Sequence, residues 1–177
     1  MSTNLQVHLL PSLIFEEQLR GGVAVVIDIL RASTTITQCL ASGASAVTPT
    51  ATVAEAHAAA AVMAEYTRPS ADSEVPADVR SKAGVLLGGE RGGTLIPGFD
   101  LDNSPMKYVP GVVSGKTVVF TTTNGTQALL KCRLAERTLI GCFSNLHSAI
   151  ALLAHESRPI HLVCAGTEGT ISTDDAL

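Results

Sequence analysis

The residues best suited to chemistry stand in short polar stretches that directly follow apolar runs. Asp28 and Arg31 follow "VAVVI", while Glu90 and Arg91 lie between two Gly-Gly pairs after "VLL". A carboxylate can bind a hard cation or accept a proton, and an arginine can make paired hydrogen bonds to a phosphate. These four residues therefore favour metal-assisted chemistry on a phosphorylated molecule, although a local ion pair and a solvated hairpin are the simpler alternatives.

A third polar stretch, "TTTNGT", follows the apolar run "KTVVF" and precedes a predicted helix. Backbone N–H groups at the start of a helix bind phosphate, and the hydroxyls of Thr122, Thr123 and Thr126 would add donors. Gly125 allows a close approach of the backbone to a ligand. An ordinary Asn-Gly turn followed by a capped helix explains the same residues equally well.

The last polar stretch contains the acidic pair Asp174 and Asp175, after the apolar run "IHLVC". Such a pair is often only a charge bias at the start of a helix. Taken with the other stretches, it extends the set of candidate ligands for a hard cation, which are Asp28, Glu90 and Asp175.

Short apolar runs alternate with amphipathic stretches along the chain, which predicts an α/β fold with a largely parallel sheet flanked by helices. We expect helices over Ser33–Ser42 and Thr52–Tyr66, with a polar surface loop over Thr67–Gly84. The chain is predicted to form a single domain over 1–177, with subdomains of about 1–82 and 83–177. Ligands of parallel α/β sheets bind beyond the carboxyl ends of the strands, which is where all the polar stretches fall.

The charge and composition of the chain limit the classes of partner that it is expected to bind. The net charge is −4 and no Lys/Arg-rich run occurs, which argues against binding to nucleic acid or an anionic membrane. No apolar run reaches the roughly 18 residues of a membrane span, and the N-terminus lacks the pattern of a signal peptide. The four cysteines have no metal-type spacing, so we expect reduced core thiols in a cytoplasmic protein.

Four blocks in order, "VVIDILRASTTI", "GGERGGTLIPGFDLDNSP", "TTTNGTQAL" and "CAGTEGTISTDD", resemble the signature blocks of the 2-phosphosulfolactate phosphatase family. The resemblance covers nearly the whole chain. It implies a phosphoric monoester hydrolase that uses Mg²⁺ to convert 2-phospho-3-sulfolactate into 3-sulfolactate and phosphate, a step towards coenzyme M. It also implies an α/β fold of two subdomains with the site between them.

The resemblance also assigns the site residues by position. The expected catalytic residues are Asp28, Arg31, Glu90 and Arg91, and the expected metal ligands are Asp28, Glu90, Asp174 and Asp175. The expected substrate-binding residues are Asn103, Ser104, Thr122, Thr123, Asn124, Gly125 and Thr126, joined by Ser33 and Thr34 from the polar stretch that follows the first apolar run. Asp28 would activate the attacking water, with a nucleophilic aspartate as the alternative.

Two departures from the family pattern bear on these expectations. Position 174 is Asp where the family usually has Glu, and the relatives continue beyond the acidic pair, whereas this sequence ends at Leu177. The C-terminal part of the family fold is therefore expected to be missing. The alternatives are a phosphatase of the same fold for another phosphorylated hydroxy acid and a non-catalytic protein that binds phosphorylated metabolites. A homo-oligomer is left open.

Overall fold

The computed structural model describes residues 4–67 and 84–176 and divides into two compact units. The first unit comprises Met1–Thr37 and Thr122–Leu177, and the second comprises Gln38–Thr121. The second unit is thus inserted into the first. The predicted division into 1–82 and 83–177 differs from this one. A cut at 82 would separate strands of the first half from their partners in the second, in both sheets.

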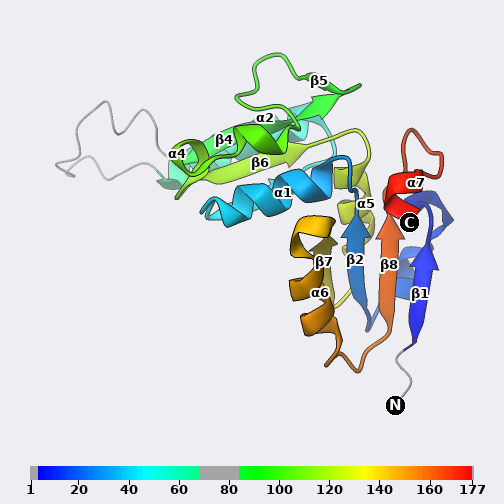
Figure 1. The fold of residues 1–177 in the computed structure, drawn as a ribbon. Helices are drawn as coiled ribbons and strands as arrows, with labels where there is room; N and C mark the ends of the chain where they lie inside the picture. Colours follow the sequence, from blue (N-terminus) through cyan, green and yellow to red (C-terminus); the bar gives the residue numbers. More distant parts are fainter. Residues whose placement is uncertain (1–3, 68–83, 177) are drawn as a thin grey trace. The chain divides into compact units, whose positions relative to one another are not determined.

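The first unit is built on a parallel sheet in the order β1-β8-β2-β7 (Figure 1). Its strands are β1 (Leu5–His8), β2 (Val23–Ile27), β7 (Arg137–Gly141) and β8 (Ile160–Cys164). Two 3₁₀ turns, η1 (Pro11–Leu13) and η2 (Glu16–Leu19), follow β1, and η4 (Phe143–Asn145) follows β7. The helices are α1 (Ala32–Ala41), which continues into the second unit, α5 (Gly125–Lys131), α6 (Leu146–Leu153) and α7 (Thr173–Ala176).

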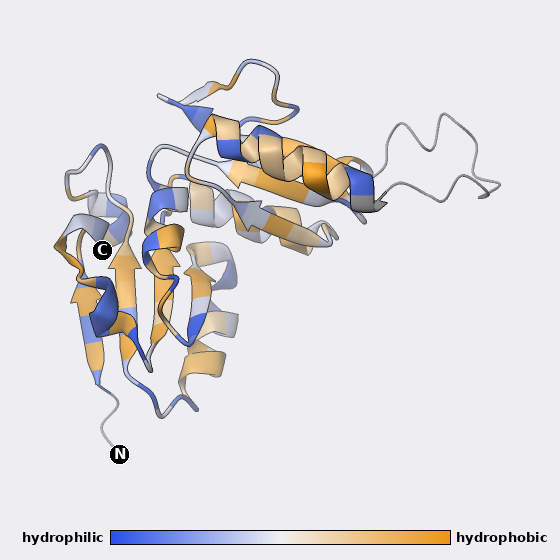
Figure 2. Ribbon diagram, turned by 180° about the vertical axis from the view of Figure 1, so that it is seen from behind, coloured by the Kyte–Doolittle hydropathy of each residue, from blue (hydrophilic) through white to orange (hydrophobic). Residues whose placement is uncertain are grey.

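The side chains of successive strand residues point to opposite faces of this sheet, and those on one face pack against α5. Ala24 and Val26 of β2 and Val163 of β8 point to one face, where they form a buried core with Ala128 and Cys132 of α5 and its C-terminus. Side chains of successive strand residues point to opposite faces, so the odd-numbered residues of β2 face the other side. The strands of this sheet are largely hydrophobic along their length (Figure 2). A parallel sheet that is apolar on both faces is suited to helices on both.

The second unit is built on a sheet in the order β3-β6-β4-β5, in which β5 alone is antiparallel to its neighbour. Its strands are β3 (Ala46–Pro49), β4 (Val85–Arg91), β5 (Thr94–Leu95) and β6 (Thr117–Thr121). Helix α2 (Val53–Thr67) packs on one face around Ala56, Phe99 and Val119. The 3₁₀ turn η3 (Pro105–Lys107) and the short helix α4 (Pro110–Val113) precede β6.

The predicted α/β class and largely parallel sheets are confirmed. Helix α2 begins where its capping residues indicate, because Thr52 Oγ1 accepts the N–H of Glu55 at 3.1 Å and Glu55 Oε2 accepts the N–H of Ala51 at 3.0 Å. The surface loop predicted over Thr67–Gly84 lies outside the described residues except at its two ends. Within the two described ranges, no helix is long and apolar enough to cross a membrane.

Three strands differ from the expectation, because β1 and β5 were not predicted and β4 is longer than predicted. β1 was not predicted, because "LQVH" is only four residues long and stands at the edge of its sheet. β4 continues from "VLL" through both glycines and the charged pair to Arg91. Gly89 has φ 138°, and a Cβ there would overlap the carbonyl oxygen of Thr121, so β4 can approach β6 only with glycine at this position.

Candidate active site

The predicted site residues fall into two groups, one in each unit. The first unit holds the Asp28–Arg31 stretch, the Thr-rich stretch and the terminal acidic pair. Because β2 pairs in parallel with β7 and β8, the residues that follow these strands lie at one edge of the sheet. The second unit holds Glu90, Arg91, Asn103 and Ser104.

The turn from β2 into α1 is held together by two hydroxyls that were predicted to bind substrate. Ser33 Oγ accepts the N–H of Asp28 at 2.9 Å and donates to the carbonyl of Val26 at 3.2 Å. Thr34 Oγ1 donates to the carbonyl of Ile29 at 2.8 Å. In this structure both side chains build the turn that presents Asp28, and their predicted contact with substrate stays a prediction.

Asp28 is a buried carboxylate with 7% of its surface exposed, and its Oδ1 accepts the N–H of Ala32 at 3.0 Å. Burial raises the pKa of Asp28 to about 6, and the negative charges of Asp175 and Asp174 add to the increase. The N–H groups of Ala32 and Arg31 act in the opposite direction. A carboxylate with a pKa near neutrality can both accept and return a proton under physiological conditions, which suits general acid–base catalysis.

Gly125 stands directly against this carboxylate. A Cβ at position 125 would overlap Oδ2 of Asp28 and the Cβ of Ala32. The Thr-rich stretch can therefore reach Asp28 only because residue 125 has no side chain. The predicted proximity of the first and third polar stretches is thus seen at one defined contact.

The remaining residues of the Thr-rich stretch mostly bond to one another. Thr122 Oγ1 accepts the N–H of Thr126 at 3.1 Å, and Thr126 Oγ1 accepts the N–H of Thr122 at 3.0 Å. Asn124 Oδ1 accepts the N–H of Glu168 at 3.1 Å, which joins this stretch to the loop after β8. The hydroxyls of Thr122 and Thr126 are buried in this arrangement, so they shape the loop, and Thr123 lies half-buried beside them.

Asp175 links the loops that follow β2 and β8. Its Oδ1 accepts the N–H of Ile29 at 2.8 Å, and its Oδ2 accepts the N–H of Gly166 at 3.0 Å. Its backbone carbonyl accepts a bond from the thiol of Cys164 at 3.1 Å. Both carboxylate oxygens are therefore already engaged by backbone donors. Nothing in the residue types signals this role, because the partners are backbone groups of Ile29 and Gly166.

Three carboxylates gather at this edge of the sheet. The pKa of Asp175 is raised first by burial and then by Asp174, and both acids raise the pKa of Asp28. Among the described residues, no three His, Cys, Asp or Glu side chains are grouped so that they could hold a metal ion by themselves. Protein sites for Mg²⁺ commonly use one or two carboxylates together with water and substrate phosphate, a set that Asp28 and its neighbours fit.

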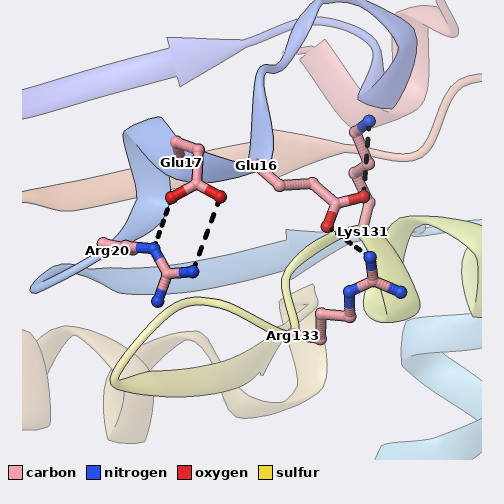
Figure 3. Close-up of polar contacts among 5 residues, drawn as sticks. All are labelled: Glu16, Glu17, Arg20, Lys131 and Arg133. Carbon is pink, nitrogen blue, oxygen red and sulfur yellow. Dashed lines mark hydrogen bonds and ion pairs between the residues drawn. The ribbon is translucent and has the colours of Figure 1, made fainter.

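Arg31 is the cation nearest in sequence to Asp28. It is half-buried, and its guanidinium forms no ion pair with any acidic side chain in the described part of the chain. Several other cations of the first unit are paired: Glu16 binds Arg133 at 2.9 Å and Lys131 at 3.7 Å, and Glu17 binds Arg20 (Figure 3). Arg31 therefore remains available for an anionic ligand.

Glu90 and Arg91 lie inside β4, where they pair with Leu95 and Thr94 of β5, and not in a loop after the strand. Glu90 is buried, and its Oε2 accepts the N–H of Gly93 at 2.7 Å. The guanidinium of Arg91 donates to the carbonyls of Glu90 and Ala51 at 2.7 and 3.1 Å, and to Thr121 Oγ1 at 2.8 Å. This stretch was predicted to lie beyond the end of its strand, but β4 continues through the glycines to Arg91 and pairs with β5 as a hairpin, which was the alternative.

Asn103 and Ser104 lie before η3 in the second unit. Asn103 is buried, and the N–H of Ser104 donates to Oδ1 of Asp102 at 3.0 Å. Ser104 precedes Pro105 at the first position of η3, as its sequence indicates, although its side chain makes no capping bond. Tyr108, which the sequence did not single out, donates its hydroxyl to the carbonyl of Asp102 at 2.8 Å and so fixes this turn.

The family model and the relatives that match this chain carry the same description. A family model described as 2-phosphosulpholactate phosphatase matches residues 8–177. A protein of Caldanaerobacter subterraneus named a probable 2-phosphosulfolactate phosphatase is 40% identical over 162 residues, which cover 92% of this chain and 60% of that protein. A Symbiobacterium thermophilum protein with the same name is 40% identical over 161 residues, and one from Thermotoga maritima is 42% identical over 154. The chain spans about three fifths of the length of these relatives.

Proposed function

Because the chain belongs to the 2-phosphosulpholactate phosphatase family, we propose that it hydrolyses 2-phospho-3-sulfolactate to 3-sulfolactate and phosphate, as in coenzyme M biosynthesis. The observation that carries this proposal is Asp28. It is a buried carboxylate with a pKa of about 6 at the carboxyl end of a central strand, with Gly125 against it. Arg31, three residues away, forms no ion pair with the acidic side chains of the described residues.

The chemistry requires a water molecule to add to phosphorus while the bond between phosphorus and the bridging ester oxygen breaks. Asp28 accepts the proton of the attacking water, and the sulfolactate oxygen takes up a proton from solvent water as its bond to phosphorus breaks. Arg31 neutralises negative charge on a substrate that carries phosphate, carboxylate and sulfonate groups. The backbone of the Thr-rich stretch, held in shape by Thr122 and Thr126, orients the phosphoryl group against Asp28.

We further propose Mg²⁺ as the cofactor, held by Asp28 with Asp174 and Asp175 nearby. Asp174 and Asp175 both raise the pKa of Asp28, so a cation bound among these three acids would relieve their repulsion. When bound, the ion would withdraw charge from the phosphoryl oxygens. Because both oxygens of Asp175 bond to backbone N–H groups, we assign its main part to holding the site in shape. Glu90 and Arg91 as ligand and anion-binding residue stay predictions.

The test is phosphate release from 2-phospho-3-sulfolactate, with Mg²⁺ and with EDTA, by the wild type and by Asp28→Asn. The amide cannot accept the proton of water, so we expect release to fall by about 10²–10⁴-fold. The matched control is Glu136→Gln, which removes an exposed carboxylate of the same unit and should leave release unchanged. Calorimetric titration of Mg²⁺ into the same variants gives a second readout, in which Asp28→Asn should weaken binding.

The outcomes separate the alternatives. Full release by Asp28→Asn would contradict its catalytic role. Magnesium-dependent release from other phosphorylated hydroxy acids, with none from 2-phospho-3-sulfolactate, would keep the phosphatase and replace the substrate. Binding of the substrate without product would identify a binding protein.

A further inference from the structure

Thr121, to which the sequence assigned no role, is the last residue of β6, and its side chain is fully buried. Its hydroxyl takes part in two hydrogen bonds, because Oγ1 donates to the carbonyl of Thr50 at 2.9 Å and accepts from Nη2 of Arg91 at 2.8 Å. A hydroxyl has only one hydrogen to donate. Since that hydrogen is engaged by Thr50, Thr121 meets the guanidinium with a lone pair of its oxygen.

The contact is made possible by the close approach of β4 to β6. Gly89 pairs with Thr121 in the parallel register of these strands, and a Cβ at position 89 would overlap the carbonyl oxygen of Thr121. Arg91 stands two residues further along β4, within reach of the Thr121 hydroxyl. All three residues belong to the second unit, so the contact is a feature of that unit alone.

The guanidinium of Arg91 is fixed by three hydrogen bonds, all of them to uncharged acceptors. Besides the bond to Thr121, Nη2 donates to the carbonyl of Ala51 at 3.1 Å, and Nη1 donates to the carbonyl of Glu90 at 2.7 Å. An arginine side chain has five N–H groups, so the Nε–H and one N–H of Nη1 remain. Neither of them has an acceptor within the described residues.

The positive charge of this guanidinium is oriented but not neutralised. Arg91 is half-buried, and it forms no ion pair in the part of the chain that the structure describes. A half-buried charge without a counter-ion is unfavourable, and an oxyanion that accepts the remaining N–H groups would relieve it. A cation that neutral groups hold in a fixed direction is suited to bind such an anion.

We propose that Thr121 is a positioning residue that holds the guanidinium of Arg91 in the direction needed to bind an oxyanion of the ligand. The inference rests on the proposed function, in which the substrate carries phosphate, carboxylate and sulfonate groups. Thr121 acts through Arg91 and does not itself contact the ligand. Without the hydroxyl, only the two backbone carbonyls hold the guanidinium, so its remaining N–H groups lose their fixed direction.

The test compares Thr121→Val, which removes the hydroxyl and keeps the shape of the side chain, with Thr121→Ser, which keeps the hydroxyl. Phosphate release from 2-phospho-3-sulfolactate gives kcat and KM for each protein. We expect Thr121→Val to raise KM about ten- to hundredfold, the effect of one hydrogen bond to a charged group, while kcat changes little. Thr121→Ser should keep the wild-type KM to within about twofold.

Thr117→Val is the matched control. Thr117 is the first residue of β6, and no hydrogen bond of its hydroxyl is found within residues 4–67 and 84–176. The same substitution at the opposite end of the same strand should leave kcat and KM unchanged. A second comparison adds Thr121→Val to Arg91→Gln. Because Thr121 acts through Arg91, the double variant should be no weaker than Arg91→Gln alone.

A binding measurement decides the inference without catalysis. The Nε–H signal of Arg91, identified by its absence in Arg91→Gln, is followed by heteronuclear NMR while inorganic phosphate or 3-sulfolactate is added. The wild type should respond to at least one of these anions, and the anion that acts identifies the group bound. Thr121→Val should need about ten times more of that anion, and Thr117→Val the same amount as the wild type.

Three results would overturn the inference. The first is an unchanged KM in Thr121→Val, and the second is an equal rise of KM in Thr121→Val and Thr121→Ser, which would show that the hydroxyl is not responsible. The third is an Arg91 signal in the wild type that responds to neither anion. If the wild type releases no phosphate at all, the proposed function fails, and the titration of the two anions still decides the part of Thr121.

Discussion

At the scale of single residues, the contact between Gly125 and Asp28 decides whether the Thr-rich stretch can reach the carboxylate. We expect Gly125→Ala to lower the rate of phosphate release by about 100-fold, because the new methyl group must displace either Asp28 or the loop. Steady-state kinetics would show the loss mainly in kcat.

The matched control for this prediction is Gly111→Ala in α4. A Cβ at Gly111 meets no atom within 4 Å, so this variant should keep the wild-type rate. Thermal unfolding of both variants would separate a displaced carboxylate from a general loss of structure. An unchanged kcat in Gly125→Ala would show that Asp28 and the loop are not required in this arrangement.

Residue types alone predicted which positions gather at the strand ends but not what each side chain does there. Asp28, Gly125 and Asp175 were all identified from the rule that parallel strands end at one edge. The hydroxyls of Ser33 and Thr126, by contrast, donate to the backbone carbonyls of Val26 and Thr122. A hydroxyl can bond to a ligand or to the chain, and that choice depends on loop geometry that spacing does not reveal.

At the scale of elements, Asp175 ties α7 to the loops after β2 and β8. Asparagine has only one acceptor oxygen, so Asp175→Asn would leave the N–H of Ile29 or of Gly166 without its bond. An unsatisfied buried donor costs about 1–3 kcal/mol, and we expect a decrease of this size in the free energy of unfolding. Urea denaturation measures it.

The neighbouring variant Asp174→Asn is the control, because the Asp174 side chain accepts only the hydroxyl of Ser172 among the bonds found in the described residues. An amide oxygen can accept that bond as well, so its unfolding free energy should stay close to that of the wild type. Equal stability of all three proteins would mean that Asp175 does not brace the two loops.

Element boundaries were predictable where local chemistry sets them. Thr52 and Glu55 start α2 through bonds within four residues, and these are visible in the sequence. β4 could not be predicted to its end, because its last residues are held by pairing with β5 and by the close approach of Gly89 to Thr121. Such contacts depend on a partner strand, which local propensity does not include.

At the scale of the whole molecule, a histidine pair makes stability depend on pH. Nε2 of His8 lies 3.1 Å from Nδ1 of His161, and the rings are stacked. Burial lowers the pKa of both, and His8 lowers that of His161 further. The folded state therefore binds protons less readily than the unfolded chain. The contribution of this pair to stability should be complete above a pH of about 6.5, the ordinary histidine pKa, and fall as the pH decreases below it.

Urea midpoints at pH 7.5 and pH 5.5 would measure this dependence. His161→Gln removes one titrating ring, so the loss of stability between the two conditions should be smaller than in the wild type. His155→Gln, at an exposed position after α6, should keep the wild-type difference. An identical difference in all three proteins would remove the histidine pair as its source.

The insertion of one unit into the other has a consequence for synthesis on the ribosome. β2, a central strand of the first sheet, ends at Ile27, yet its two partners begin at Arg137 and Ile160. During translation β2 emerges long before β7 and β8. The backbone N–H and C=O groups on both sides of β2 therefore lack their strand partners while the complete second unit is synthesised. Such distant pairing slows folding, so the nascent first segment is where a chaperone would be needed most.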